Sequence, residues 1–370
     1  MTLPSSSLAL RSRLQSDGWL RLSLDQVPIA APVGQELLVA MQAAPVNPTD
    51  LNLLLAGADL ANIETDGQCL RIPVGPDLMA AHRRRLDQSL GTGLEGAGLV
   101  IATGPDSRHL LGRTVAVFGT GAFGTHRLVQ PQDCIVFGDD VSADVAAGAI
   151  INPMTALCML DRCRRDGHRA IIHTAAGSSL GRMLERACVA EAVPVINILR
   201  HDAAAAALRA DGSAWALAST ADSFDADLVA AIRATDASIA FDAIGAGPMI
   251  GRILAAMEEV FAPPPEAYDI YGSRRMKQIC VYGGLNPGPI EVPRRFGMAW
   301  QVSGWLMMNH LATLSPEQVA AMKARIAQGI TTTFRTDFAE DIALHDLLSP
   351  DRLRMLRRME SGRKVRLRLG

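Results

Sequence analysis

The residues best suited to chemistry form a glycine-bearing turn, Ala175-Ala176-Gly177-Ser178-Ser179-Leu180-Gly181. The apolar segment 170–174 before it is typical of a buried strand, and residues 180–189 after it carry apolar side chains at helical spacing. Such a turn can bind a dinucleotide pyrophosphate, because free N–H groups and the helix dipole attract anions at a helix start. Its two glycines are four residues apart and do not form GxGxxG, so the motif alone fits a steric need for glycine equally well. Its position at the first strand of an alternating region favours a nucleotide site, with contacts from Ala176, Gly177, Ser178, Ser179 and Leu180.

A basic residue follows the next predicted strand, 193–199. Arg200 lies 23 residues after Gly177, close to the spacing of about 20 at which dinucleotide sites hold the adenosine ribose. An acidic residue there would select NAD, whereas arginine suits the 2′-phosphate of NADP. The sequence therefore predicts NADPH as cofactor; the alternative is a solvated arginine at a strand end.

These segments belong to a region in which predicted strands and helices alternate. The strands are 170–174, 193–199, 214–218, 238–243 and 278–283, and the helices are 180–189, 203–210, 225–235 and 249–260. Strands alternating with helices of this length indicate a parallel, doubly wound α/β sheet.

The first 145 residues are β-rich by pattern, with candidate strands at 36–43, 97–103, 113–118 and 128–137. The intervening segment 57–91 has weak periodicity and contains Arg83-Arg84-Arg85. We expect a long loop there, functional or partly disordered, whose arginines form either a solvated helix face or an anion site. A strand-like segment at 364–367 could complete this first domain.

Charge and composition restrict the possible partners. Lys and Arg (36) nearly balance Asp and Glu (38), and aromatics make up 4%, so neither a nucleic acid nor an anionic membrane is an expected partner. The six cysteines form no CxxC pair, which favours reduced, buried thiols. The first 20 residues lack a signal-peptide pattern, and the longest apolar run, 145–160, is too short to span a bilayer. We expect a soluble, cytoplasmic protein.

Further titratable candidates have alternative structural interpretations. Tyr271 and Tyr282 could reach a catalytic cleft or simply pack. His173 fits a core or turn histidine better than a catalytic base. Asp50, after Pro-Thr, could do acid–base chemistry or cap a helix. The segment 298–308, with Met and Trp at helical spacing, could be core, pocket lining or a subunit interface.

Five stretches together resemble one family. They are residues 44–50 (APVNPTD), 93–98 (GLEGAG) with a glycine at 104, 152–156 (NPMTA), 173–176 (HTAA) and 241–245 (FDAIG). In this order they resemble medium-chain dehydrogenases/reductases of the zinc-free NADPH:quinone oxidoreductase or enone reductase type.

The resemblance implies a GroES-like β-rich catalytic domain, formed by residues 1–148 and 326–370, around a Rossmann NADP-binding domain at 149–325. It implies that Thr155 contacts the nicotinamide and that Gly245, Tyr282 and Gly283 border it. Asn47 would lie beside the hydride-transfer site, with Tyr271 as a second catalytic candidate. A homodimer is the expected assembly.

The chain departs from the zinc-dependent relatives of this family. Leu94 stands where they have a histidine, no cysteine occupies the Asn47 segment, and their four closely spaced structural cysteines are missing. Catalytic zinc takes about three protein ligands, which Glu95 alone cannot supply. We therefore predict no metal.

Without a metal, conjugate reduction is the favoured chemistry, because charge spreads onto a carbonyl oxygen that hydrogen bonds can stabilise. The hypothesis is hydride transfer from NADPH to a quinone or α,β-unsaturated carbonyl, with Asn47 orienting the substrate. Two alternatives remain: a catalytically silent, crystallin-like nucleotide-binding protein, and a zinc-free ketone or alcohol oxidoreductase.

Overall fold

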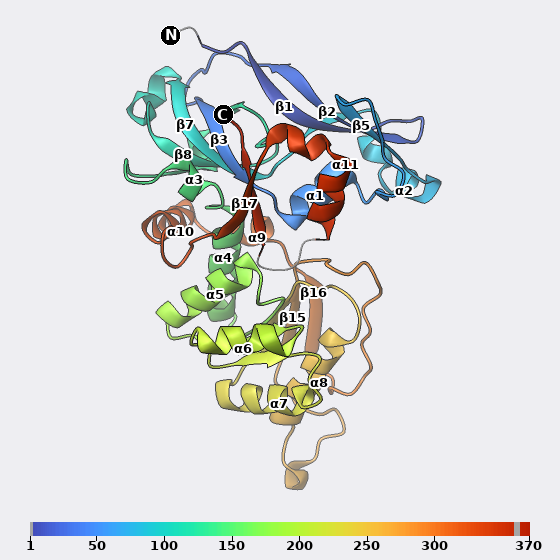
Figure 1. Ribbon diagram of the computed structural model, residues 1–370. Helices are drawn as coiled ribbons and strands as arrows, with labels where there is room; N and C mark the ends of the chain where they lie inside the picture. The colour runs from blue at the N-terminus through green and yellow to red at the C-terminus, as the bar shows by residue number, and fades with distance from the viewer. Residues whose placement is uncertain (1–2, 359–362) are drawn as a thin grey trace. The chain divides into compact units, whose positions relative to one another are not determined.

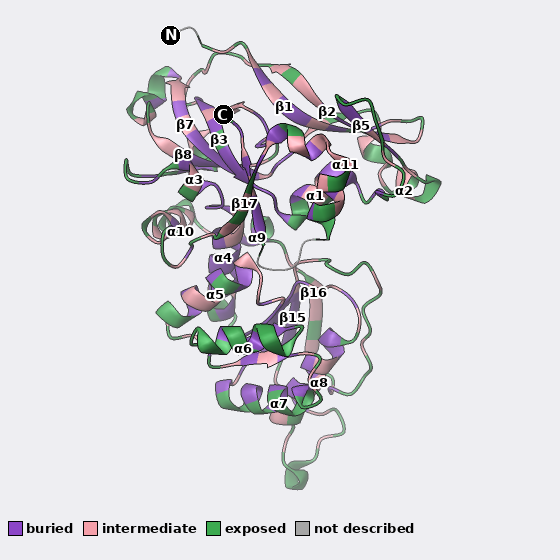
Figure 2. Cartoon of the chain, viewed as in Figure 1, coloured by how far each residue is buried: buried purple, intermediate pink, exposed green. Residues whose placement is uncertain are grey.

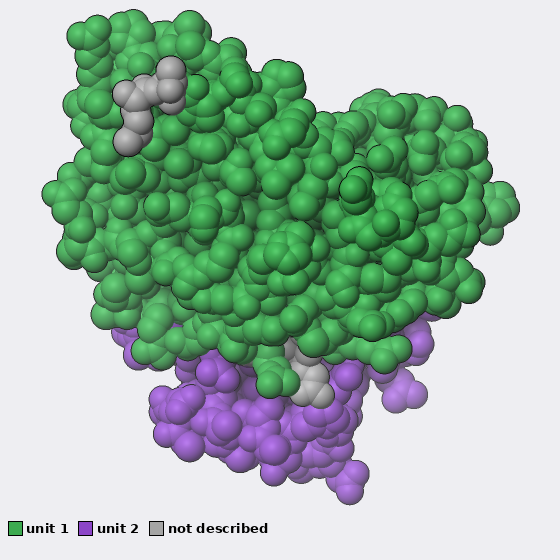
Figure 3. Space-filling model, turned by 45° about the horizontal axis from the view of Figure 1, so that its top comes forward, with its two compact units in different colours: residues 1–151, 323–370 green, residues 152–322 purple. Residues whose placement is uncertain are grey.

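A computed structural model describes residues 3–358 and 363–370 of the chain. The chain divides into two compact units (Figures 1 and 3). Unit 1 comprises residues 1–151 and 323–370, and unit 2 comprises residues 152–322. Each unit is described by itself.

Unit 2 is built on one six-stranded sheet in which every pairing is parallel. In spatial order its strands are β13 (Ala216–Ala218), β12 (Val195–Leu199), β11 (Ile171–Thr174), β14 (Ile239–Asp242), β15 (Lys277–Val281) and β16 (Trp300–Gly304). Numbered along the chain this order is 3-2-1-4-5-6, that of doubly wound dinucleotide-binding sheets. The predicted α/β class is confirmed.

Four helices connect successive strands: α5 (Ser179–Ala190), α6 (Asp202–Ala210), α7 (Phe224–Thr235) and α8 (Met249–Phe261). α4 (Ile151–Arg165) precedes β11, and α9 (Met307–Leu311) follows β16. Ile172 and Ile196 pack in one buried cluster with residues of α7 and α8. Successive side chains of a strand point to opposite faces, and Asn197, next to Ile196, hydrogen-bonds Glu185 of α5. The sheet is thus covered on both faces, and its central strands β12, β11 and β14 are buried (Figure 2).

Unit 1 contains two antiparallel-rich sheets. The first has the order β4 (Glu64–Thr65), β5 (Cys69–Pro73), β2 (Trp19–Pro28), β1 (Ser6–Leu14), β6 (Ser89–Gly91). The second has the order β10 (Cys134–Val136), β8 (Thr114–Phe118), β7 (Glu95–Thr103), β3 (Leu37–Pro45), β18 (Lys364–Arg368), β17 (Phe338–Ala343), with β9 (His126–Val129) also paired to β3. The C-terminal strand β18 therefore pairs with β3 from near the start of the chain.

Five helices complete unit 1 or enter it: α1 (Pro48–Leu55), α2 (Pro76–Ala81), α3 (Ala143–Ala146), α10 (Pro316–Gln328) and α11 (Pro350–Arg357). Its core joins both sheets and includes apolar residues of α1 and α11, among them Leu54, Leu353 and Leu356.

Three sequence expectations need correction. The segment 57–91 is not a long loop, because it contributes β4, β5, α2 and β6. In β5 the buried residues Leu70 and Ile72 alternate with Arg71, but this pattern is too short to predict a strand from the sequence. The segment 128–137 is two strands separated by a turn of 3-10 helix, Pro131–Asp133. The segment 298–308 is not one helix, since Trp300–Gly304 forms the edge strand β16.

All six cysteines are buried free thiols, as predicted. Within the described residues, no helix is long and apolar enough to cross a membrane.

Candidate active site

Asn47 is placed by the junction between β3 and α1. Pro48 occupies the first helical position, where its missing N–H costs no hydrogen bond, and Asn47 is the N-cap. Asp50, three residues later, accepts a hydrogen bond from the Asn47 backbone N–H at 2.8 Å. Its second oxygen accepts from the Leu94 N–H at 2.9 Å. Asp50 thus caps the helix, one of its two predicted roles, and ties the 44–50 segment to the 93–98 segment.

Glu95 fixes the side chain of Asn47. One carboxylate oxygen accepts from Asn47 Nδ2 at 2.9 Å, and the other accepts from the N–H groups of Ile150 and Ile151 at 3.0 and 2.9 Å. The latter two lie at the start of α4, where the helix dipole favours a negative charge. Because a carboxylate only accepts, the Asn47 amide must present its NH₂ to Glu95. Its carbonyl oxygen and second N–H remain for other partners.

Lys364 adds an ammonium to this cluster. It begins β18, is 7% exposed, and its Nζ has no hydrogen-bond partner among the residues that the structure describes. Burial lowers the pKa of Lys364, while the charges of Glu95 and Asp50 oppose that shift. Burial, followed by the charge of Glu95, raises the pKa of Asp50 to about 7 against opposing hydrogen bonds and Lys364.

Asn47, Asp50, Glu95 and Lys364 therefore form one buried polar cluster in unit 1, called here the Asn47 cluster. It combines two carboxyl groups, an ammonium and an oriented amide, and Asp50 can exchange a proton near neutral pH. The sequence analysis did not identify Lys364 as a site residue. The one indication of its burial is that it begins a strand in which Val365 and Leu367 are buried.

The predicted nucleotide turn lies at the carboxyl edge of the unit 2 sheet. Ser178 is the N-cap of α5, and its Oγ accepts from the Gly181 N–H at 3.1 Å. A Cβ on Gly181 would lie 2.2 Å from the Ala176 carbonyl oxygen, so only glycine allows the helix to approach the turn. At Gly177 a Cβ would meet nothing nearer than a Leu199 methyl at 3.5 Å. A Cβ at Gly177 would therefore make only an ordinary contact. The N–H groups of the first turn of α5 lack intrahelical carbonyl partners, and that of Gly181 donates to Ser178 Oγ instead.

Arg200 follows the last residue of β12 and is exposed. Its backbone carbonyl accepts from the Thr220 hydroxyl at 2.8 Å, which fixes the main chain and leaves the guanidinium in solvent. The Leu199 methyl that borders Gly177 belongs to the preceding residue. The turn and Arg200 thus share one edge of the sheet.

The neighbouring strand end is held by a buried carboxylate. Asp242, at the end of β14, accepts from the Thr174 hydroxyl at 2.7 Å and from the Gly245 N–H at 2.8 Å. Gly245 has φ of +73°, and a Cβ there would lie 2.6 Å from the Gly283 carbonyl oxygen. The ends of β14 and β15 therefore approach so closely that glycine is required. Asp242 and Thr174 were part of recognised motifs, but their mutual contact was not foreseen.

Two further predicted residues of unit 2 are held by side-chain contacts. The Tyr282 hydroxyl lies 2.8 Å from Nε2 of the fully buried His173. Burial lowers the pKa of His173 to about 3, which confirms a neutral core histidine; burial likewise raises the pKa of Tyr282. Thr155, on α4, donates from its hydroxyl to the Met307 sulfur at 3.3 Å.

Tyr271 does not belong to this edge. It lies between α8 and β15, and a connection from a helix into the next parallel strand arrives at the amino edge of the sheet. The Met298 N–H donates to its carbonyl at 2.9 Å, just before β16 begins. Tyr271 is 62% exposed and lies at the amino edge of the sheet, opposite to the Gly177 turn. Tyr271 is therefore not part of the candidate site at the carboxyl edge. The sequence could not show this, because it depends on the order of the strands in the sheet.

Comparisons with known proteins bear on this architecture. No protein-family model matches the chain. It is similar to the mitochondrial enoyl-(acyl-carrier-protein) reductase of Caenorhabditis elegans, 28% identical over 209 residues, or 55% of this chain and 54% of the relative. The chain thus spans about half the length of the curated relatives it matches.

Solved structures match over the whole chain. One is a putative NADPH:quinone reductase from Mesorhizobium loti, 21% identical, covering 100% of both chains with a TM-score of 0.71. Another is the Etr1p/NADP/crotonyl-CoA complex, 16% identical, covering 98% of this chain and 99% of that one with a TM-score of 0.69. The chain has the fold of medium-chain dehydrogenases/reductases. That fold combines a GroES-like domain with a Rossmann domain.

Within the described part of the chain, no group of three or more His, Cys, Asp or Glu side chains is arranged to hold a metal ion.

Proposed function

We propose that the protein is an NADPH-dependent reductase of electron-poor carbonyl compounds, with hydride passing to a quinone or to the β-carbon of an α,β-unsaturated carbonyl. The observation that carries the proposal is the 3-2-1-4-5-6 parallel sheet with the start of α5 and Arg200 at its carboxyl edge. Ligands of such sheets bind outside the carboxyl ends of the strands.

The residues at this edge fit NADPH. The N–H groups of Ser179 and Leu180 at the start of α5, with Gly177 and the N-cap Ser178 before them, would bind its pyrophosphate. The exposed guanidinium of Arg200 would pair with the 2′-phosphate. The nicotinamide would be bordered by Gly245 and Gly283, at the closely approaching ends of β14 and β15, and by Thr155 and Tyr282. When bound, NADPH supplies the hydride.

We propose Asn47 of unit 1 as the substrate-orienting group. Glu95 occupies one N–H of Asn47, so the remaining N–H can donate to the substrate carbonyl oxygen, on which charge develops during conjugate reduction. The bond to Glu95 fixes the amide before substrate arrives, which avoids a reorganisation cost during reaction. A hydroxyl group or a water molecule would supply the proton to the resulting enolate.

The names of similar proteins support this reading from two directions. One solved structure is named an NADPH:quinone reductase, and another holds NADP and crotonyl-CoA. The curated relative is named a mitochondrial enoyl-(acyl-carrier-protein) reductase. An enoyl thioester is an α,β-unsaturated carbonyl, so it belongs to the proposed substrate class.

The test begins with cofactor binding, followed through nicotinamide fluorescence with NADPH and NADH. We expect preferential binding of NADPH, weakened about tenfold or more by Arg200→Glu. Arg233→Glu is the matched control, because Arg233 is also exposed on unit 2 but lies on α7, away from the carboxyl edge. Equal loss in both variants, or no binding, would refute the cofactor assignment.

Turnover is then measured by NADPH consumption with a quinone, an enone and a saturated ketone, with product analysis. Reduction of the enone C=C bond or of the quinone supports the proposal. Reduction of the ketone alone would favour carbonyl chemistry, and binding without turnover would favour a silent nucleotide-binding protein.

A further inference from the structure

Strand β18 carries three cations at alternate positions, Lys364, Arg366 and Arg368, and alternate residues of a strand share one face. Arg366 pairs with Asp341 at 2.7 Å. Arg368 pairs with Asp341 at 2.7 Å and also with Asp144. Lys364 is the most deeply buried of the three, yet its Nζ has no hydrogen-bond partner among the described residues. The cation with the greatest need of an acceptor is thus the one without it.

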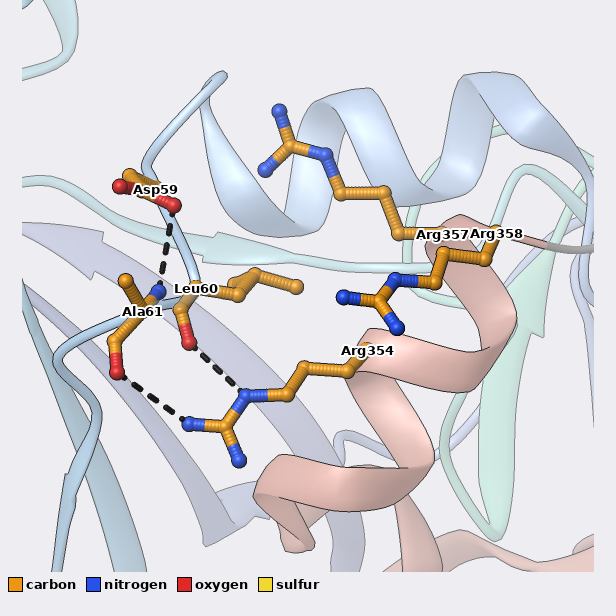
Figure 4. A pocket seen from close by; sticks show the side chains of 6 residues that line it. All are labelled: Asp59, Leu60, Ala61, Arg354, Arg357 and Arg358. Carbon is orange, nitrogen blue, oxygen red and sulfur yellow. Dashed lines mark hydrogen bonds between the residues drawn. The ribbon is translucent and has the colours of Figure 1, made fainter.

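Other cations near the C-terminus do not share this property. Arg354 Nε donates to the Leu60 carbonyl at 3.0 Å beside a small surface pocket (Figure 4). Arg357 and Arg358 line the same pocket and are exposed, so water can satisfy their guanidinium groups. Lys364 is shielded from bulk solvent, and its N–H donors need an acceptor from elsewhere.

The carboxylates of the Asn47 cluster meet this need only at a distance. Burial lowers the pKa of Lys364, whereas the charges of Glu95 and Asp50 favour its ammonium form. Every carboxylate oxygen of these two residues already accepts from an amide N–H, and none accepts from Nζ. A buried ammonium with unused donors is costly unless an acceptor joins it.

The register of the sheet places Lys364 beside Asn47. β18 pairs antiparallel with β3, and the pairing extends to Val46, whose N–H donates to the Val365 carbonyl at 2.9 Å. The next pair in this register is Asn47 with Lys364. Val46 and Val365 both pack in the unit 1 core, so Asn47 and Lys364 share the other face. Cβ atoms of directly opposite residues lie about 5 Å apart.

Two hydrogen-bond donors therefore remain side by side on this face. Glu95 takes one N–H of the Asn47 amide and leaves the second, and Lys364 adds its ammonium. The negative charge of Glu95 opposes a permanently anionic ligand at this place. A carbonyl oxygen fits better, because it is neutral when it binds and becomes negative only during reaction.

We propose that Lys364 Nζ and Asn47 Nδ2 form an oxyanion hole, in which both donate to the carbonyl oxygen of the substrate. The inference rests on the proposed reductase function and adds Lys364 to it as a catalytic residue.

The charge that this hole stabilises follows from the electron balance of conjugate reduction. The β-carbon gains a C–H bond from the hydride as NADPH is oxidised to NADP⁺. The electron pair of the C=C bond then forms the new bond between the α-carbon and the carbonyl carbon, and the carbonyl π pair moves onto oxygen. Protonation of the α-carbon by a hydroxyl group or a water molecule restores the carbonyl. Donors that are fixed beforehand stabilise the intermediate oxyanion without reorganisation.

The first test measures reduction of an enone by NADPH in Lys364→Met, which keeps the side-chain length and removes the charge. The kcat should fall about 100-fold, while the KM for the enone changes less than about threefold, because the interaction strengthens as charge develops. Lys364→Arg keeps a cationic donor and should recover part of the loss. Arg363→Met is the matched control, since it removes an exposed neighbouring cation. An unchanged kcat in Lys364→Met, or an equal loss in Arg363→Met, overturns the proposal.

The second test needs no turnover. 4-Nitrophenol is a stable mimic of the enolate, because its oxygen becomes an anion whose formation is followed by absorbance. It is titrated against pH when bound to the protein, with and without NADP⁺. Lys364→Met should raise the pH midpoint of ionisation of the bound phenol by about one unit, and Arg363→Met should not. Equal midpoints in Lys364→Met and the unaltered protein, or no binding of the phenol, contradict the oxyanion hole.

A purely structural lysine gives a different pattern. Urea unfolding would then show lower stability in Lys364→Met, with no change in the phenol midpoint, and the proposal would fail. Failure of the reductase function is also distinguishable. If the unaltered protein reduces no enone or quinone but the midpoint depends on Lys364, the oxyanion hole stands and the proposed function does not.

Discussion

The hydrogen bond between Asn47 and Glu95 has a defined donor and acceptor, and variants can test this direction without a substrate. Asn47→Asp would place two carboxylates face to face, whereas Glu95→Gln would offer an NH₂ where Asn47 already presents one. In the double variant the carboxylate introduced at position 47 can accept from the amide introduced at position 95. Each single change should therefore be costly, and the pair should partly restore the contact.

The magnitudes follow from the bonds involved. Glu95→Gln weakens two charge-assisted bonds to Ile150 and Ile151, at roughly 1 kcal/mol each, and removes a favourable helix-dipole contact of about 0.5 kcal/mol. We expect a loss of about 2–3 kcal/mol. Asn47→Asp should cost a similar amount at neutral pH, because a buried like-charge pair forms. The double variant should be less destabilised than the sum by about 1–2 kcal/mol.

The assay is hydrogen–deuterium exchange on peptides that contain Ile150 and Ile151, together with urea unfolding. Exchange reports local opening where the Glu95 bonds lie. Asn52→Asp on the exposed side of α1 is the matched control and should combine additively with Glu95→Gln. If the Asn47 and Glu95 changes also add to within about 0.5 kcal/mol, the two side chains are not hydrogen-bonded and the derived orientation of Asn47 is wrong.

Three further predictions concern other parts of the molecule. The raised pKa of Asp50 means that the folded state retains a proton that the unfolded chain has lost. The free energy of unfolding should therefore fall as pH rises from about 4 to about 7, by up to about 4 kcal/mol. In Asp50→Asn this pH dependence of unfolding should flatten. The fully buried Lys277 forms an ion pair with Glu258 at 2.7 Å. Lys277→Ala should lower the free energy of unfolding by about 3–5 kcal/mol, because it leaves a buried charge unpaired. In thermal melts, adding Glu258→Gln to Lys277→Ala should recover part of that lost stability. Tyr271→Phe should leave kcat and KM for NADPH unchanged, since Tyr271 lies at the amino edge; a kcat loss of about tenfold or more would return Tyr271 to the site.

Local pattern was sufficient for five of the six strands of the doubly wound sheet. Its strands are short, apolar and separated by helices with a clear 3.6-residue period, so each element could be read from its own residues. The turn at Gly177 and the strand end at Arg200 could be placed for the same reason. By contrast, the short alternating strand at 69–73 and the edge strand at 300–304 carry weak local patterns, and pairing with neighbouring strands determines them.

The sequence by itself determined the alternating strands and helices between residues 170 and 283 and which residues stand at their ends. Only the tertiary structure decided that Glu95 holds the Asn47 amide, that Lys364 joins them from the last strand, and that Tyr271 lies at the wrong edge. The physical reason is that strand order and register bring together residues far apart in the chain, through hydrogen bonds and burial that leave no local periodicity.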